Sequence, residues 1–169
     1  MIRLLGAAVL AAFFCNACSH ENPVETVPID SHLISTQSFS INLPNTFEIT
    51  SFSGESSRLP AHLTVVEGQN LITISKAAYF RDINESCKLA ANNFVHDMSE
   101  ITSGPRVLGG ICRISAKTRG IKSVLFMIRD NDNGILYSIT YKGALSRLRE
   151  IVKTLRGDRF LDILKYQYW

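Results

Sequence analysis

The sequence is poor in the patterns from which catalytic and metal sites are built. Its four histidines are scattered, and none lies at ligand spacing from a cysteine, which argues against a zinc site. No G-x-S-x-G sequence marks a nucleophilic serine, and His96 cannot face its neighbour Asp97 on a helix. Neither a lysine nor a helix start follows Gly109-Gly110, so this pair is no phosphate loop. We expect a protein that is not an enzyme and uses no cofactor or metal ion.

Long hydrophobic runs are also missing, with one exception near the start. Leu4–Phe14 is an uncharged apolar stretch of about 11 residues, which suits a signal-peptide core and is too short to span a bilayer. Ala17 followed by Cys18 resembles the cleavage and acylation site of a bacterial lipoprotein. Because the two positions before Ala17 depart from that pattern, ordinary cleavage after Ala17 is the alternative. We expect a signal peptide over residues 1–17 and a lipid on Cys18.

The leader also predicts a location. In bacterial lipoproteins a serine after the acylated cysteine, here Ser19, accompanies sorting to the outer membrane. Residues 18–37 are polar and contain Pro23 and Pro28, which is typical of a flexible tether. We expect a lipid-anchored protein of the outer membrane that faces the periplasm, with a single domain over residues 38–169. Nucleic acid is not an expected partner there.

Cysteines are scarce beyond the leader, where only Cys87 and Cys112 remain. An exported chain meets an oxidising compartment, so we expect these two to form a disulfide bond. The bond would close a loop of about 25 residues and stabilise the fold by roughly 3 kcal/mol. Two buried free thiols are the alternative.

Acidic residues are rare in the C-terminal part. Residues 19–105 contain 4 Lys/Arg and 10 Asp/Glu, whereas residues 106–169 contain 13 Lys/Arg and 5 Asp/Glu. This asymmetry favours contact with an acidic protein surface or anionic lipid, and ordinary solvated faces are the alternative. Partner binding is predicted for three basic residues on one helix, Arg147, Arg149 and Lys153.

Aromatic residues gather at the C-terminal end, which is the other candidate binding surface. Tyr and Trp are favoured at protein interfaces. Tyr166, Tyr168 and Trp169 are therefore candidate partner-binding residues, and packing of this tail over the sheet is the alternative.

Two patterns of periodicity predict the elements of the domain. Alternating apolar residues predict strands, and apolar residues at helical spacing predict two helices. Asp82 and Glu85 form a capping-box arrangement at the start of the first helix, and Gly104-Pro105 ends that segment. The expected strands are 38–43, 62–66, 71–75, 107–118, 121–129 and 135–141, and the chain is expected to continue extended through Phe47, Ile49 and Phe52. The expected helices are 82–98 and 144–155.

Several glycines are expected to have local roles. Gly109-Gly110 predicts a bulge or a close backbone approach within strand 107–118. Gly157 is well placed to cap the second helix. Asp130-Asn131-Asp132-Asn133-Gly134 has calcium-type ligands, but its glycine comes one place early and Tyr141 stands where Glu is needed. We therefore expect a hairpin turn there.

Together these elements predict an α+β fold, with an antiparallel sheet of about six strands and two helices packed on it. The order that begins at Phe39-Ser40-Ile41-Asn42-Leu43-Pro44 resembles the PsbP-like fold, in particular the DcrB-like bacterial lipoproteins. The resemblance covers residues 38–156 and implies a mostly non-enzymatic family without catalytic residues. It does not account for the Cys87/Cys112 pair or the aromatic tail.

Location and composition favour a function in binding. The first hypothesis is a periplasm-facing lipoprotein that binds another protein, most specifically an immunity protein that neutralises an antibacterial effector of type VI secretion. The second is a DcrB-like envelope factor that supports outer-membrane or uptake machinery. The third, an enzyme with an unrecognised site, requires titratable residues gathered in one pocket.

Overall fold

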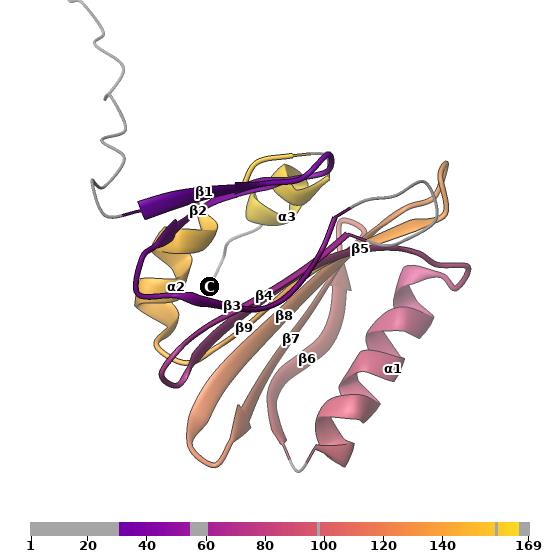
Figure 1. The fold of residues 1–169 in the computed structure, drawn as a ribbon. Coiled ribbons are helices and arrows are strands. Elements are labelled where there is room, and N and C mark those ends of the chain that lie inside the picture. The colour runs from indigo at the N-terminus through magenta and orange to yellow at the C-terminus, as the bar shows by residue number, and fades with distance from the viewer. Residues whose placement is uncertain (1–30, 55–60, 98, 158, 166–169) are drawn as a thin grey trace, which may run out of the picture.

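The fold is α+β and mostly antiparallel, as predicted, but it has more elements than the sequence suggests (Figure 1). The computed structural model describes residues 31–54, 61–97, 99–157 and 159–165, and these form nine strands and three helices. The strands are β1 (Ser31–Ser35), β2 (Ser40–Pro44), β3 (Glu48–Ser53), β4 (Ala61–Glu67), β5 (Asn70–Ala78), β6 (Glu100–Leu108), β7 (Ile111–Thr118), β8 (Ile121–Asp130) and β9 (Ile135–Lys142). The helices are α1 (Ile83–His96), α2 (Leu145–Val152) and α3 (Phe160–Lys165).

Seven strands form one sheet in the order β3-β4-β5-β9-β8-β7-β6, and β1 and β2 form a separate hairpin. Figure 1 shows α1 on one face of the large sheet, and the β1–β2 hairpin with α2 and α3 on the other. Strand β8 is therefore buried on both faces, as its apolar sequence predicts. Phe126 and its alternate neighbours pack under the hairpin and α2, while Leu125 and Met127 pack under α1.

Helix α1 begins and is fastened as the sequence predicts. The Asp82 side chain accepts hydrogen bonds from the backbone N–H groups of Asn84 and Glu85, at 2.6 and 3.0 Å. Both hydrogen bonds lower the pKa of Asp82, and the hydrogen bond from the Glu85 N–H has the larger effect. Cys87 forms the expected disulfide bond with Cys112 on β7. The expected apolar face is narrower than predicted, since Val95 is 60% exposed.

Strand β6 corrects two predictions. Gly104-Pro105 does not end a segment but lies inside β6, at a shift of register on the edge of the sheet. An edge strand tolerates proline because its outward N–H needs no partner within the sheet. Gly109-Gly110 is not a bulge but the two-residue turn between β6 and β7, where both glycines have positive φ, 58° and 78°. Such turns favour glycine because their backbone is strained for other residues.

The start of the domain is also corrected. Residues 18–37 were predicted as a tether, but Ser31–Ser35 form β1 and pair with β2. The predicted signal peptide over 1–17, the predicted lipid on Cys18 and residues 18–30 of the predicted tether lie outside the described residues, while residues 36–37 belong to the connection between β1 and β2. None of the helices in the described part of the chain is both long and apolar enough to cross a bilayer.

The C-terminal helical region differs from the prediction as well. Helix α2 ends at Val152 rather than at Leu155, so Gly157 does not cap it. Gly157 has a φ of 120° and lies where the chain passes β2, so that a Cβ at this position would collide with the Ser38 carbonyl oxygen. The chain then enters α3, whose first residue, Phe160, is fully buried.

Candidate functional site

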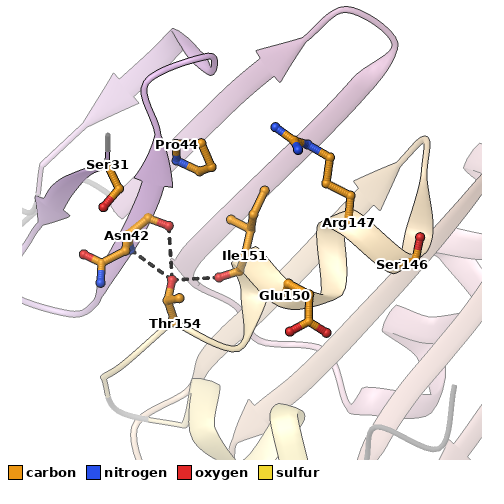
Figure 2. A pocket seen from close by; sticks show the side chains of 8 residues that line it. All are labelled: Ser31, Asn42, Pro44, Ser146, Arg147, Glu150, Ile151 and Thr154. Atoms are coloured by element: carbon orange, nitrogen blue, oxygen red, sulfur yellow. Dashed lines mark hydrogen bonds between the residues drawn. The ribbon is translucent and has the colours of Figure 1, made fainter. Parts of the chain in front are cut away.

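A groove of about 610 Å³ runs between the β1–β2 hairpin and α2 (Figure 2). Pro44 and Ile151 supply its apolar surface, while Asn42 and Arg147 bring polar groups to its walls. The full lining consists of Ser31, Asn42, Pro44, Ser146, Arg147, Glu150, Ile151 and Thr154. The groove is therefore an apolar recess with charged side chains on its helical side.

The Thr154 hydroxyl fixes the floor of this groove by joining α2 to β2. It accepts a hydrogen bond from the Asn42 backbone N–H at 3.0 Å. It donates to the Ile151 carbonyl oxygen at 2.7 Å, and the Asn42 carbonyl oxygen lies at 3.2 Å (Figure 2). Just beyond, Ser40 and Arg156 exchange two backbone hydrogen bonds of 2.9 and 2.8 Å. The hairpin is thereby held to the segment that follows α2.

Thr154→Val should lower the free energy of unfolding by about 1–3 kcal/mol. Valine has the same shape but leaves the Asn42 N–H without its acceptor in a partly buried position. Urea unfolding measures the change. The matched control is Thr102→Val, because Thr102 is exposed on β6 and should change stability by no more than about 0.5 kcal/mol. Equal stability of the two variants would contradict the role of this hydroxyl.

The start of α2 is stabilised by residues of the β4–β5 turn. Its N-cap, Ala144, has no capping side chain, but the Ala144 N–H donates to the Asn70 side-chain oxygen at 2.8 Å. Arg147 donates to both oxygens of Glu67, with Nε at 2.8 Å, and Asn70 donates to the same carboxylate at 3.1 Å. The hydrogen bond from Arg147 is the main reason why the pKa of Glu67 is lowered.

Three of the predicted partner-binding residues are described, and they have different surroundings. Arg147 is paired with Glu67, and Lys153 forms an ion pair of 2.7 Å with Glu150. Arg149 is half-buried on another side of α2. Tyr166, Tyr168 and Trp169 lie outside the described residues. Arg149 and Arg113 of β7 both act on the phenol of Tyr141.

The phenol of Tyr141 lies near two cationic side chains, Arg149 and Arg113. Its side chain is fully buried in the main core, and burial raises the pKa of its phenol above the usual value. The positive charges of Arg149 and Arg113 oppose that shift, so both guanidinium groups lie near the phenol. Arg113 also lies over the Phe126 ring, 5.9 Å from its centroid.

Arg113 belongs to a row of basic residues that we call the basic shelf: Arg106, Arg113, Lys117 and Lys122. Arg106 pairs with Arg113 across β6 and β7, and Lys117 pairs with Lys122 across β7 and β8. Arg113 and Lys117 are four residues apart on one strand, so all four side chains share a face of the sheet. This is the face that α2 covers in part, and three of the four are exposed.

The sequence contains a signal for the basic shelf, but the prediction placed the binding cations on α2 instead. Six basic residues and no acidic residue occur between Arg106 and Arg129. Their alternation along β7 would have placed Arg113 and Lys117 on one face. Only the pairing of β6 with β7 adds Arg106, and that hairpin was predicted as one strand.

The Asp130–Gly134 segment is a hairpin turn between β8 and β9, as predicted. The Asp130 carboxylate accepts hydrogen bonds from the Asn133 side chain at 2.8 Å and from the Asp132 N–H at 3.1 Å. The Asn133 hydrogen bond lowers the pKa of Asp130. Within the described residues, no three His, Cys, Asp or Glu side chains gather in a way that could hold a metal ion.

Comparison with known proteins gives no relative from which a role could be transferred. The chain matches no known protein family, and no curated protein is similar enough to count as a match.

Proposed function

We propose that this protein is a non-catalytic, periplasm-facing lipoprotein that acts by binding another protein. In the most specific version of this proposal, it is an immunity protein that neutralises an antibacterial effector of type VI secretion. The predicted signal peptide over residues 1–17, followed by Cys18, supports the location, because an inhibitor anchored through Cys18 meets effectors that act in the periplasm. The Cys87–Cys112 disulfide bond is consistent with an oxidising compartment.

The basic shelf is the observation that carries the binding proposal. A row of cations on one face of a rigid sheet attracts an acidic surface and accelerates its association. The sheet fixes the spacing of the backbone positions that carry these charges, so little backbone entropy is lost on binding. The partner that fits the shelf is therefore a protein with an acidic patch.

The test uses the protein encoded by the neighbouring gene as the candidate effector. We expect the mature domain to bind it and to protect cells that export it. Arg106→Glu/Lys117→Glu should weaken binding at least about 100-fold, because it reverses two exposed cations at the contact. Titration calorimetry measures the affinity, and survival of the cells measures protection.

Lys88→Glu/Lys165→Glu is the matched control. It makes the same change of charge at exposed positions on α1 and α3. It should leave affinity and protection unchanged, whereas wild-type affinity should fall as ionic strength rises. If the wild-type domain neither binds nor protects, the proposal is overturned. If both variants lose the same affinity, the basic shelf is not the binding surface.

The order of elements supports a second proposal, a DcrB-like envelope factor with a PsbP-like fold. Strand β2 ends in Leu43-Pro44, and a hairpin, a long helix, a meander and a closing helix follow, which is the order that the resemblance to DcrB-like lipoproteins implies. The additional hairpin strand β1 and edge strand β6 are departures that this proposal must accommodate. It requires that deletion of the gene cause an envelope defect when no effector is present.

A further inference from the structure

Leu108 extends the basic shelf with an exposed apolar side chain. It is 66% exposed at the end of β6, two residues after Arg106. Leu108 pairs with Ile111 of β7, and Ile111 packs into the main core under the hairpin and α2. Val107, which lies between Leu108 and Arg106, packs on the opposite face under α1. Leu108 therefore lies on the same face of the sheet as the four cations of the basic shelf.

The paired strands arrange this face in four rows that follow one another along β7. The rows are Leu108 with Ile111, Arg106 with Arg113, Ser103 with Ser115, and Glu100 with Lys117 and Lys122. Successive residues on one face of a strand are about 7 Å apart, so the first row lies about 20 Å from the last. An apolar end is thus followed at regular steps by cations, by hydroxyl groups and by cations again.

The charges on and around the rows favour an acidic partner. On these rows, all of whose residues the structure describes, Glu100 is the one acidic side chain, and it is exposed opposite Lys117. The charged side chains that border the rows are Arg119 in the β7–β8 turn, Arg149 on α2, and Asp130 at the end of β8, on which the positive charge of Arg159 acts. Cations outnumber acids here, so this face attracts a negatively charged surface and repels a positively charged one.

The outer edge of β6 opposes the addition of a partner strand to the sheet. β6 is an edge strand that shifts register before Ser103 and again before Arg106, and Pro105 has no N–H to donate. Interruptions of this kind protect an edge from pairing with another chain. A partner that meets the four rows therefore lies on the face of the sheet rather than along its edge.

The spacing of the rows favours an extended segment over a helix. An extended chain presents every second side chain on one side, about 7 Å apart, and so stays in step with the rows. One turn of a helix advances only about 5.4 Å, so a helix lying along β7 would be about 4 Å out of step after three rows.

We propose that the effector binds this face through one extended acidic segment. An apolar side chain of the segment packs against Leu108, and carboxylates about two and six residues away from it meet Arg106 and the pair of Lys117 and Lys122. This inference rests on the proposed function, and it adds the conformation and the residue pattern of the contact. The cations speed the formation of the complex, whereas the apolar contact slows its dissociation.

Leu108→Ser should weaken binding to the neighbouring gene's product about 10-fold, mainly through faster dissociation, because it removes the apolar contact. Leu33→Ser is the matched control, because Leu33 is 65% exposed but lies on the β1–β2 hairpin. It should change affinity less than about threefold. Surface plasmon resonance measures both rates, and urea unfolding checks that both variants keep wild-type stability.

Glu100→Gln should strengthen binding about threefold through faster association, because it removes the charge that repels the carboxylates of the segment. A gain of affinity cannot result from a loss of folding. Glu48→Gln makes the same change at an exposed position on β3, at the other edge of the sheet, and should leave binding unchanged. The gain with Glu100→Gln should shrink as ionic strength rises.

Cross-linking within the complex tests the conformation of the bound segment. A photoreactive benzoyl-phenylalanine replaces Leu108, and a carbodiimide joins the amines of Lys117 and Lys122 to carboxylates of the effector. The two kinds of cross-link should fall on one segment of the effector, about six residues apart. A separation of about 13 residues, as in a helix, would overturn the proposal, and so would cross-links to segments far apart in the effector's sequence.

The binding measurements separate this inference from the proposed function. If wild type binds and Leu108→Ser binds equally well, the contact at Leu108 is overturned while the proposed function stands. If Glu100→Gln brings no gain, the acidic character of the segment is overturned in the same way. If wild type does not bind the effector, both proposals fail.

Discussion

Phe160→Ala should lower the free energy of unfolding by about 3–5 kcal/mol, the range for an aromatic side chain removed from a packed core. The Phe160 ring is fully buried and meets two other aromatic rings edge to face. Its centroid lies 5.6 Å from that of Phe39 and 5.2 Å from that of Tyr137. The substitution would leave a cavity between α3, the start of β2 and the central strand β9. Urea unfolding followed by circular dichroism measures the loss.

Leu161→Ala is the control on the same helix, because Leu161 is 41% exposed. It should cost no more than about 1 kcal/mol. If Phe160→Ala were as mild, α3 would not be a structural part of the domain. Phe160 is also the first aromatic residue of the C-terminal stretch that ends in Tyr166, Tyr168 and Trp169, for which the sequence allows either packing or binding. For Phe160 the structure shows packing.

The variant Cys87→Ala/Cys112→Ala should lower the free energy of unfolding by about 3 kcal/mol. The bond closes a loop 25 residues long in sequence, and its loss enlarges the unfolded ensemble. Helix α1 has little other fastening, because its buried residues are only Ser86, Cys87 and Ala91, and its other core contacts are partly buried. Hydrogen exchange should therefore speed up in α1 more than in β8 and β9, which form the centre of the sheet.

Wild-type protein in reducing agent provides the matched comparison. It should unfold at the same urea concentration as the double variant, because both lack the same cross-link. Wild-type protein without reductant should remain about 3 kcal/mol more stable. Equal stability of the double variant and the oxidised protein would show that α1 is held by packing alone.

Strands with one buried face could be predicted from sequence, and so could their tight turns. The hairpin of β4 and β5 alternates because Leu63 and Ile74 face the core while their neighbours face outward. The N-cap at Asp82 and the Cys87–Cys112 bond were predictable because each depends on residue type and compartment. These features are local or chemical, so the sequence carries them directly.

Two strands with few buried residues, β1 and β6, escaped prediction, whereas the exposed strand β3 lies where an extended segment was expected. Most side chains of β6 are exposed, so no alternation marks it, and its Gly104-Pro105 is typical of a loop. In β1, Ile34 is the one buried residue, and the segment otherwise resembles a polar tether. An edge strand is specified mainly by the strand it pairs with, which a local pattern does not show.

The candidate site was hidden for a related reason. The groove brings Asn42 and Thr154 together although 112 residues separate them in the sequence. The sequence indicated that the C-terminal half is basic, but it pointed to α2, where Arg147 and Lys153 are already paired with acids. The basic shelf requires the register of β6, β7 and β8.

The contact between Asn42 and Thr154 also has a consequence for the order of folding. The β1–β2 hairpin comes early in the sequence, but the segment that holds it in place follows every strand of the large sheet. Contacts of such long sequence separation form late, because a long loop must close first. We therefore expect the hairpin to dock last, after residues 153–157 have emerged. A chain cut short before them would leave Ile41 and Leu43 uncovered, exposed to aggregation and proteases.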